Sequence, residues 1–253
     1  MESKINIRRI THLLKYELVL SKQPLLIGIL GVVAFILAIS AMASSVEPKG
    51  LVRVSTMESI YPLLFGLGGA VVTSFSFHRI STKGGALNYL SLPASREEKF
   101  LVIFLSTALI YPLGVTLVFV IGQLIAKLGW TVTGGEFQMY NPFLITDTNL
   151  IKNVTLVYFT MHSFYFLGSI LFKKYSFLKS TVAFFVLAFV FWLVVAIGLV
   201  ALVGAAADQN MFTFEFNDQM IQERLGYVVQ VVVVSFILGL WGLSFLKFKK
   251  KEV

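Results

Sequence analysis

Residues 23–46 read QPLLIGILGVVAFILAISAMASSV, a run of 24 residues without a charged side chain. A helix rises about 1.5 Å per residue, so roughly 20 apolar residues cross the hydrocarbon core of a bilayer, which is about 30 Å thick. Five further uncharged runs of similar length follow, at residues 59–77, 100–126, 153–172, 180–207 and 225–246. The sequence therefore predicts an all-α integral membrane protein with six transmembrane helices.

The composition supports this fold class. Hydrophobic residues make up 57% of the chain and charged residues 13%, whereas about 25% of the residues in an ordinary soluble domain are charged. One helical bundle with short connections uses all 253 residues, so we expect a single transmembrane domain over residues 1–253, and any energy-converting domain must belong to another chain. The chain has no cysteine, which excludes disulfides and cysteine metal sites, and we expect no cofactor.

The basic residues are distributed unevenly between the two sides of the predicted bundle. With the N-terminus in the cytoplasm, sixteen of the 21 Lys and Arg residues lie on the cytoplasmic side. Cytoplasmic loops retain an excess of Lys and Arg, so this asymmetry places both termini inside and the loops at residues 128–151 and 208–224 outside a plasma (inner) membrane. The net charge of +8 is then an orientation signal helped by anionic membrane lipid, and not a nucleic-acid site.

The segment before the first run, residues 5–20, has its own pattern. Ile7, Ile10, Leu14 and Leu18 recur at helical spacing, while basic residues occupy other faces. This pattern predicts an N-terminal amphipathic helix that lies in the membrane surface, the alternative being a basic tail that serves topology alone. The first run exceeds the roughly 7–15 apolar residues of a signal-peptide core, so we expect it to remain as an anchor.

The second cytoplasmic loop, residues 78–99, contains several structural signals. Gly84 and Gly85 interrupt the helical pattern. A short helix is expected after Gly85, and Pro93 ends it. Ser95 followed by Glu98 is a capping-box pattern that opens the third run. The loop either only turns the chain or is also a docking surface. The residues of its short helix are Ala86, Leu87, Asn88, Tyr89, Leu90, Ser91 and Leu92.

The third run begins with the sequence LPASREEKF, residues 92–100. The chain resembles the membrane subunits of ABC exporters of the type-2 permease class in three features: this sequence, the six spans and the amphipathic N-terminal helix. The resemblance implies that residues 86–92 form a coupling helix that docks on a separate ATP-binding cassette ATPase. It also implies an ATP-driven exporter whose path is formed by two permease copies or paralogues.

The chain has no motif for a catalytic role of its own. It contains no Gly-Lys pair and hence no Walker A sequence, and it lacks the Gly-x-Ser-x-Gly and His-Glu-x-x-His patterns. We therefore expect that the chain is not an enzyme and that ATP is hydrolysed only by a separate partner subunit. The main alternative is a non-transporting polytopic membrane module for assembly or sensing with a cytoplasmic regulator.

Within the spans, three features stand out. His162 lies near the middle of the fourth run, where it lines a translocation path or a proton route, or else bonds across helices to a hydroxyl or carbonyl. Pro112 predicts a kink in the third span, because proline supplies no backbone donor. Small residues, among them Gly66, Gly69 and Gly122, favour close helix packing.

Overall fold

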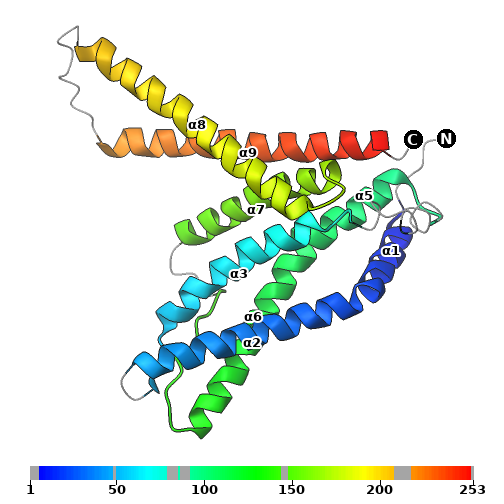
Figure 1. Cartoon of the computed structure of the whole chain (residues 1–253), viewed down its shortest axis with the longest axis vertical. Helices are drawn as coiled ribbons and strands as arrows, with labels where there is room; N and C mark the ends of the chain where they lie inside the picture. Colours follow the sequence, from blue (N-terminus) through cyan, green and yellow to red (C-terminus); the bar gives the residue numbers. More distant parts are fainter. Residues whose placement is uncertain are drawn as a thin grey trace.

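The computed structural model describes residues 6–47, 50–78, 85, 92–143, 148–207 and 218–251. The described residues are almost entirely helical, with one isolated β-bridge between Val52 and Phe137. Figure 1 shows the helices in chain order. They are α1 (Ile7–Leu20), α2 (Lys22–Val46), α3 (Val54–Ser74), α5 (Arg96–Leu105), the π-helical turn η3 (Ser106–Ile110), α6 (Tyr111–Val132), α7 (Thr148–Leu171), α8 (Ser176–Ala207) and α9 (Asp218–Lys251).

Five segments of the described chain are long and apolar enough to cross a membrane, which supports a membrane protein. These are Lys22–Val46, Arg96–Val132, Val154–Leu171, Ser176–Gly198 and Val229–Lys250. They correspond to the first, third, fourth, fifth and sixth runs of the sequence. Most of the second run lies in α3, a 21-residue helix that ends at Ser74 and also holds Glu58 and an internal Pro62. This helix is outside the set of five.

The N-terminal segment is helical over Ile7–Leu20, close to the range expected from its periodicity. Asn6 caps its start, and the side-chain oxygen of Asn6 accepts a hydrogen bond from the Arg8 N–H at 3.0 Å. Of its residues only Ile10 is buried within the chain. Ser21 alone separates α1 from α2, and the two helices run in different directions (Figure 1).

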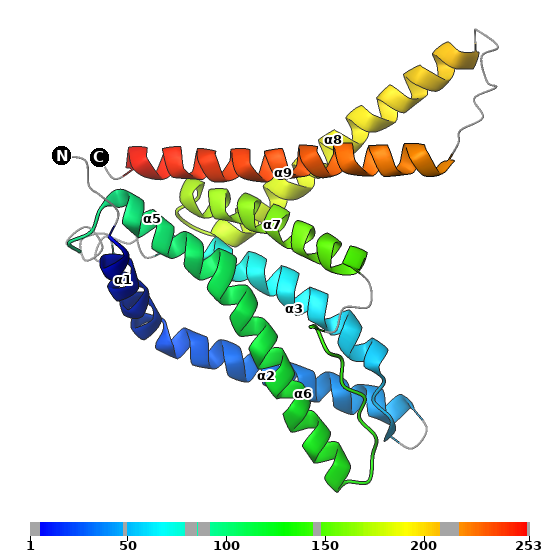
Figure 2. The same cartoon turned by 180° about the vertical axis from the view of Figure 1, so that it is seen from behind.

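The third span is one continuous path through α5, η3 and α6, and it bends where Pro112 was expected to disturb it. The Tyr111 N–H donates to the Ser106 carbonyl, five residues earlier, which is the hydrogen bond of a π-helical turn. A wider turn relieves the clash between a proline ring and the preceding turn. Figure 2 shows the change of direction between α5 and α6.

Two of the three glycines named from the sequence lie at close helix contacts. A Cβ at Gly122 would lie 2.7 Å from the Ile36 side chain, and one at Gly69 would lie 2.6 Å from Tyr158. These distances are shorter than atoms tolerate, so both positions require glycine as long as the neighbours stay in place. A Cβ at Gly66 would meet no atom of the described residues within 4 Å, so the close packing predicted there is not made within this chain.

The helices divide into a packed group and a diverging one. Buried apolar residues form one cluster of α2, α3, α6 and the chain around Phe137, and a second cluster of Phe77, Ile103, Phe166, Ile170 and Phe248. In contrast, the most apolar part of α8 buries none of its residues. Figures 1 and 2 show α8 leaving the bundle while α9 stays packed along α7.

Candidate functional site

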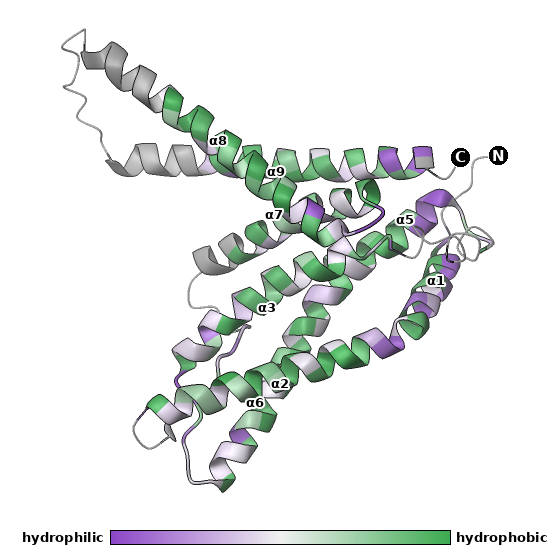
Figure 3. Ribbon diagram, viewed as in Figure 1, coloured by the Kyte–Doolittle hydropathy of each residue, from purple (hydrophilic) through white to green (hydrophobic). Residues whose placement is uncertain are grey.

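The first candidate site is a junction where α1, the start of α5 and the end of α9 meet. Hydrophilic residues gather on these three parts of the chain (Figure 3). The carboxylate of Glu98 lies at the centre of the junction and its side chain is fully buried, at 0% exposure. Taking a charge out of water is costly unless hydrogen bonds and an opposite charge compensate it.

Glu98 has such compensation from two directions. Its Oε2 accepts a hydrogen bond from the Ser95 N–H at 2.9 Å, while the Glu98 N–H donates to Ser95 Oγ at 3.2 Å. This reciprocal pair is the capping box that the Ser95–Glu98 spacing predicted. Its Oε1 accepts from the Asn6 N–H at 2.9 Å and lies 3.4 Å from Nε of Arg9, whose side chain is 44% exposed. One carboxylate therefore joins α1 to α5 across 92 residues of chain.

The third element of the junction is the C-terminal end of α9. Arg96, the first residue of α5, donates from Nη1 to the Lys249 carbonyl at 3.4 Å. Leu92, the last residue of the predicted coupling helix, packs against the cluster that includes Phe77 and Phe248. The other six residues of that predicted helix, Ala86, Leu87, Asn88, Tyr89, Leu90 and Ser91, lie outside the described residues.

The second candidate site surrounds His162 in the middle of α7, where the ring is 1% exposed. The indole N–H of Trp241 donates to His162 Nδ1 at 3.2 Å, and His162 Nε2 lies 2.9 Å from Thr107 Oγ1. An indole nitrogen can only donate, so Nδ1 accepts and the ring proton is on Nε2, which donates to Thr107. Thr107 in turn donates to the Ile103 carbonyl at 3.1 Å. The imidazole of His162 is therefore neutral, with Nδ1 accepting one hydrogen bond and Nε2 donating another.

Tyr158 completes this network through the π-helical turn. In a π-helical pattern the Thr107 carbonyl would accept from residue 112, but Pro112 has no N–H to give. The Tyr158 hydroxyl donates to that carbonyl at 2.6 Å. Pro112 and His162, which are 50 residues apart in sequence, are thus linked through one threonine.

The surroundings of His162 are aromatic. The rings of Phe104, Tyr158, Phe166 and Trp241 all lie within about 6 Å of the imidazole, centroid to centroid. A neutral, fully hydrogen-bonded ring inside such a shell fits helix–helix packing better than proton transfer. Among the described residues, no group of three or more His, Cys, Asp or Glu side chains could hold a metal ion, and His12 and His78 are both exposed.

Local sequence patterns predict only part of each site. The Ser95–Glu98 capping box, His162 and Pro112 stand out in the sequence. The contacts of Glu98 with Asn6 and Arg9, and those of His162 with Trp241 and Thr107, do not. Each missed contact joins residues at least 55 positions apart. A signal for the first one was present in the basic, Asn-capped start of α1.

The chain matches no family model, no curated protein and no solved structure.

Proposed function

We propose that this chain is the membrane-spanning subunit of an ATP-driven ABC exporter. In this proposal α3 is a sixth span beside the five apolar ones, and α1 lies in the cytoplasmic surface of the plasma (inner) membrane, with both termini inside. Two copies, or one copy and a paralogue, form the path. Separate ATPase subunits hydrolyse ATP, and this chain does not.

The observation that carries the proposal is the Glu98 junction. A coupling element has to pass a displacement of a cytoplasmic loop to the spans. Residues 86–92 lead directly into Ser95 and Glu98, which are bonded to each other and to α1. From there the chain continues without a break through α5, η3 and α6. A push on the loop would therefore move the third span and α1 together, since one buried carboxylate holds both.

The test is co-purification with an ATPase encoded beside this chain. We expect the double variant Leu87→Asp/Tyr89→Asp to lose the partner, because two charges would enter an apolar contact. Val132→Asp is the matched control, since Val132 is exposed at the far end of α6 and a charge there leaves the loop intact. If both variants retain the ATPase equally and its stimulated hydrolysis is unchanged, residues 86–92 have no coupling role.

The second candidate function, a non-transporting membrane module, has one observation in its favour. His162, the side chain that could line a path, uses both ring nitrogens inside the chain. The two functions differ in one measurement on the reconstituted complex. An exporter shows ATP turnover that changes with substrate, since substrate binds inward and outward states differently; a module shows turnover that is independent of any exported compound.

A further inference from the structure

The buried apolar residues of the bundle form two cores that share no residue. The junction core lies at the end that holds the Glu98 junction, and it consists of Phe77, Ile103, Phe166, Ile170 and Phe248. The far core is built from α2, α3, α6 and the chain around Phe137. Its buried residues are Ile36, Val52, Met57, Ile60, Phe119, Ala126 and Phe137. Packed cores have low compressibility, so we expect a large motion of these helices to take place between the two cores.

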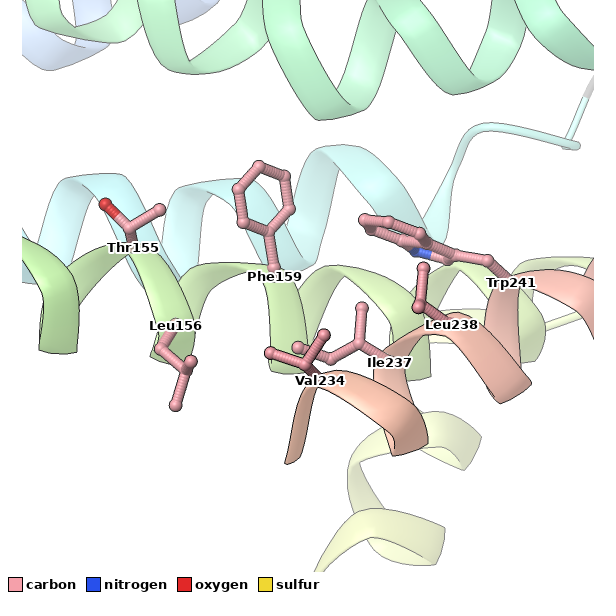
Figure 4. Close-up of a pocket in the computed structure, with 7 residues that line it drawn as sticks. All are labelled: Thr155, Leu156, Phe159, Val234, Ile237, Leu238 and Trp241. Carbon is pink, nitrogen blue, oxygen red and sulfur yellow. The ribbon is translucent and has the colours of Figure 1, made fainter. Parts of the chain in front are cut away.

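Contacts between rings extend the junction core along α7 and α9. The rings of Phe159 and Trp241 meet edge to face, with centroids 5.7 Å apart, in the region that Figure 4 shows. Trp241 also contacts the ring of Phe104 on α5, with centroids 4.9 Å apart, and donates to His162. The helices α5 and α7 and the part of α9 around Trp241 therefore form one packed unit, the junction group.

Two connecting segments run from one core to the other. In α3 the segment lies between Leu64, which packs on the far core, and Phe77. In the third span it lies between Phe104, which packs on the junction core, and Phe119. Bending a regular helix in hydrocarbon strains backbone hydrogen bonds that no water replaces, so bends concentrate where the helical pattern is already interrupted. The third span has such an interruption in this segment, the π-helical turn η3 followed by Pro112.

Each connecting segment also contains a glycine that no contact within the described chain explains. These glycines are Gly66 in α3 and Gly114 in the third span, and a Cβ at either would meet no atom of the described residues within 4 Å. A glycine inside a helix costs about 1 kcal/mol relative to alanine. Since no close packing of the described residues offsets that cost, the effect of both glycines within this chain is to soften the helix between the cores.

The two ends of the π-helical turn are anchored to different parts of the bundle. Thr107, its second residue, is hydrogen-bonded through its hydroxyl to His162 and through its carbonyl to Tyr158, both on α7. Tyr111, which directly follows the turn, donates from its hydroxyl to the Leu64 carbonyl of α3 at 2.8 Å. Residues 108–110 therefore lie between an anchor in the junction group and an anchor beside the far core. Because Tyr111 joins the third span to α3 here, the two connecting segments bend at a shared level.

We propose that η3, Pro112 and the part of α3 around Gly66 form one hinge, about which the far core turns relative to the junction group. Hinges are short stretches that absorb the change in backbone angles between two packed parts, and π-helical turns are frequent at functional sites. The connection from α1 to α2 permits this motion, because Glu98 holds α1 on α5 and only Ser21 separates α1 from α2. The hinge depends only on packing within this chain and stands independently of the exporter proposal.

Distances between paired spin labels test the hinge, and the chain suits this method because it has no cysteine of its own. Leu128→Cys on α6 and Leu171→Cys on α7 place one exposed label beside each core. Two internal pairs each share a label with this crossing pair: Met42→Cys with Leu128→Cys beside the far core, and Leu171→Cys with Leu246→Cys in the junction group. In phosphatidylcholine nanodiscs the crossing distance distribution should be at least about twice as wide as either internal one. A crossing distribution as narrow as the internal ones would overturn the proposal.

Stiffening the connecting segments supplies the second part of the test. Gly66→Ala/Gly114→Ala, added to the crossing pair, should narrow its distribution by about a third or more, because alanine stabilises the helix at both positions. Gly239→Ala/Gly242→Ala is the matched control, since these two glycines also meet no described atom within 4 Å but lie in α9, which packs along α7. Its crossing distribution should equal that of the parent. The internal pairs are measured in both variants and should keep their distances, because the cores are unchanged. Equal crossing widths in the two double variants would overturn the hinge.

Discussion

Glu98 and His162 are both polar side chains buried in the same bundle, but their surroundings differ in kind. Glu98 is charged, lies at one end of the bundle, and is held by two backbone N–H groups and an arginine that is 44% exposed. His162 is neutral, lies at mid-span, and is held by side chains of two other helices inside an aromatic shell. The difference indicates that one site is built to join elements at a surface, whereas the other fixes helices inside the membrane.

Removing the His162 ring tests the internal site and should have the largest effect. His162→Ala leaves a cavity and strands the Trp241 N–H, which we expect to lower the free energy of unfolding by about 2–4 kcal/mol. Thermal unfolding in detergent measures this. Ser163→Ala is the control, because the Ser163 hydroxyl is equally buried but bonds only within its own helix, to Thr160. Similar losses in the two variants would show that the network adds nothing beyond burial.

Removing the Glu98 carboxylate tests the junction and should have the next largest effect. Glu98→Ala leaves the Asn6 and Ser95 N–H groups without their acceptor and removes the capping box, at a cost of about 1–3 kcal/mol. Glu98→Gln preserves a capping box and should recover about half of that loss. Glu97→Ala, one residue earlier in the same first turn, should cost only about 0.5 kcal/mol. A Glu97 variant as unstable as the Glu98 variant would mean that the α1 contact contributes nothing.

A smaller effect tests the link between Pro112 and the network. Tyr158→Phe removes the hydroxyl that donates to the Thr107 carbonyl, and we expect a loss of about 0.6–1.5 kcal/mol, as for interhelical hydrogen bonds in membranes. Pro112→Ala restores an N–H at the position where the π-helical pattern lacks one. In that background Tyr158→Phe should therefore cost less, which a double-mutant cycle measures. Strict additivity of the two substitutions would remove Pro112 from the explanation.

The two sites also show what local sequence patterns can and cannot predict. Uncharged runs predicted the apolar helices because length and hydropathy are local properties, and the capping box was readable because Ser95 and Glu98 are three residues apart. The second oxygen of Glu98 could not be assigned, since its partners on α1 are 89 or more residues away. His162 was identified as a polar residue that needs a partner, but the choice of Trp241 and Thr107 depends on helix packing. The π-helical turn could not be predicted from the sequence either. The proline at position 112 predicts a bend, but it does not indicate that the Thr107 carbonyl accepts a hydrogen bond from Tyr158.

The smallest expected effect separates the charge at the Glu98 junction from its backbone hydrogen bonds. Arg9→Ala removes an ion-pair partner that lies 3.4 Å from Glu98 Oε1 and is partly exposed, so water and salt screen the pair and we expect a loss below about 1 kcal/mol. The Asn6 and Ser95 N–H groups still compensate the carboxylate in this variant.

If the charge pair matters, the difference in unfolding temperature between Arg9→Ala and the parent should shrink as salt rises from low to about 1 M. Arg8→Ala is the control, because it removes one charge from the same helix, whereas the ion pair with Glu98 is made by Arg9. Its effect should be smaller than that of Arg9→Ala at low salt and equal to it at high salt. A loss for Arg9→Ala as large as that for Glu98→Ala would show that the ion pair, and not the backbone donors, holds α1 on α5.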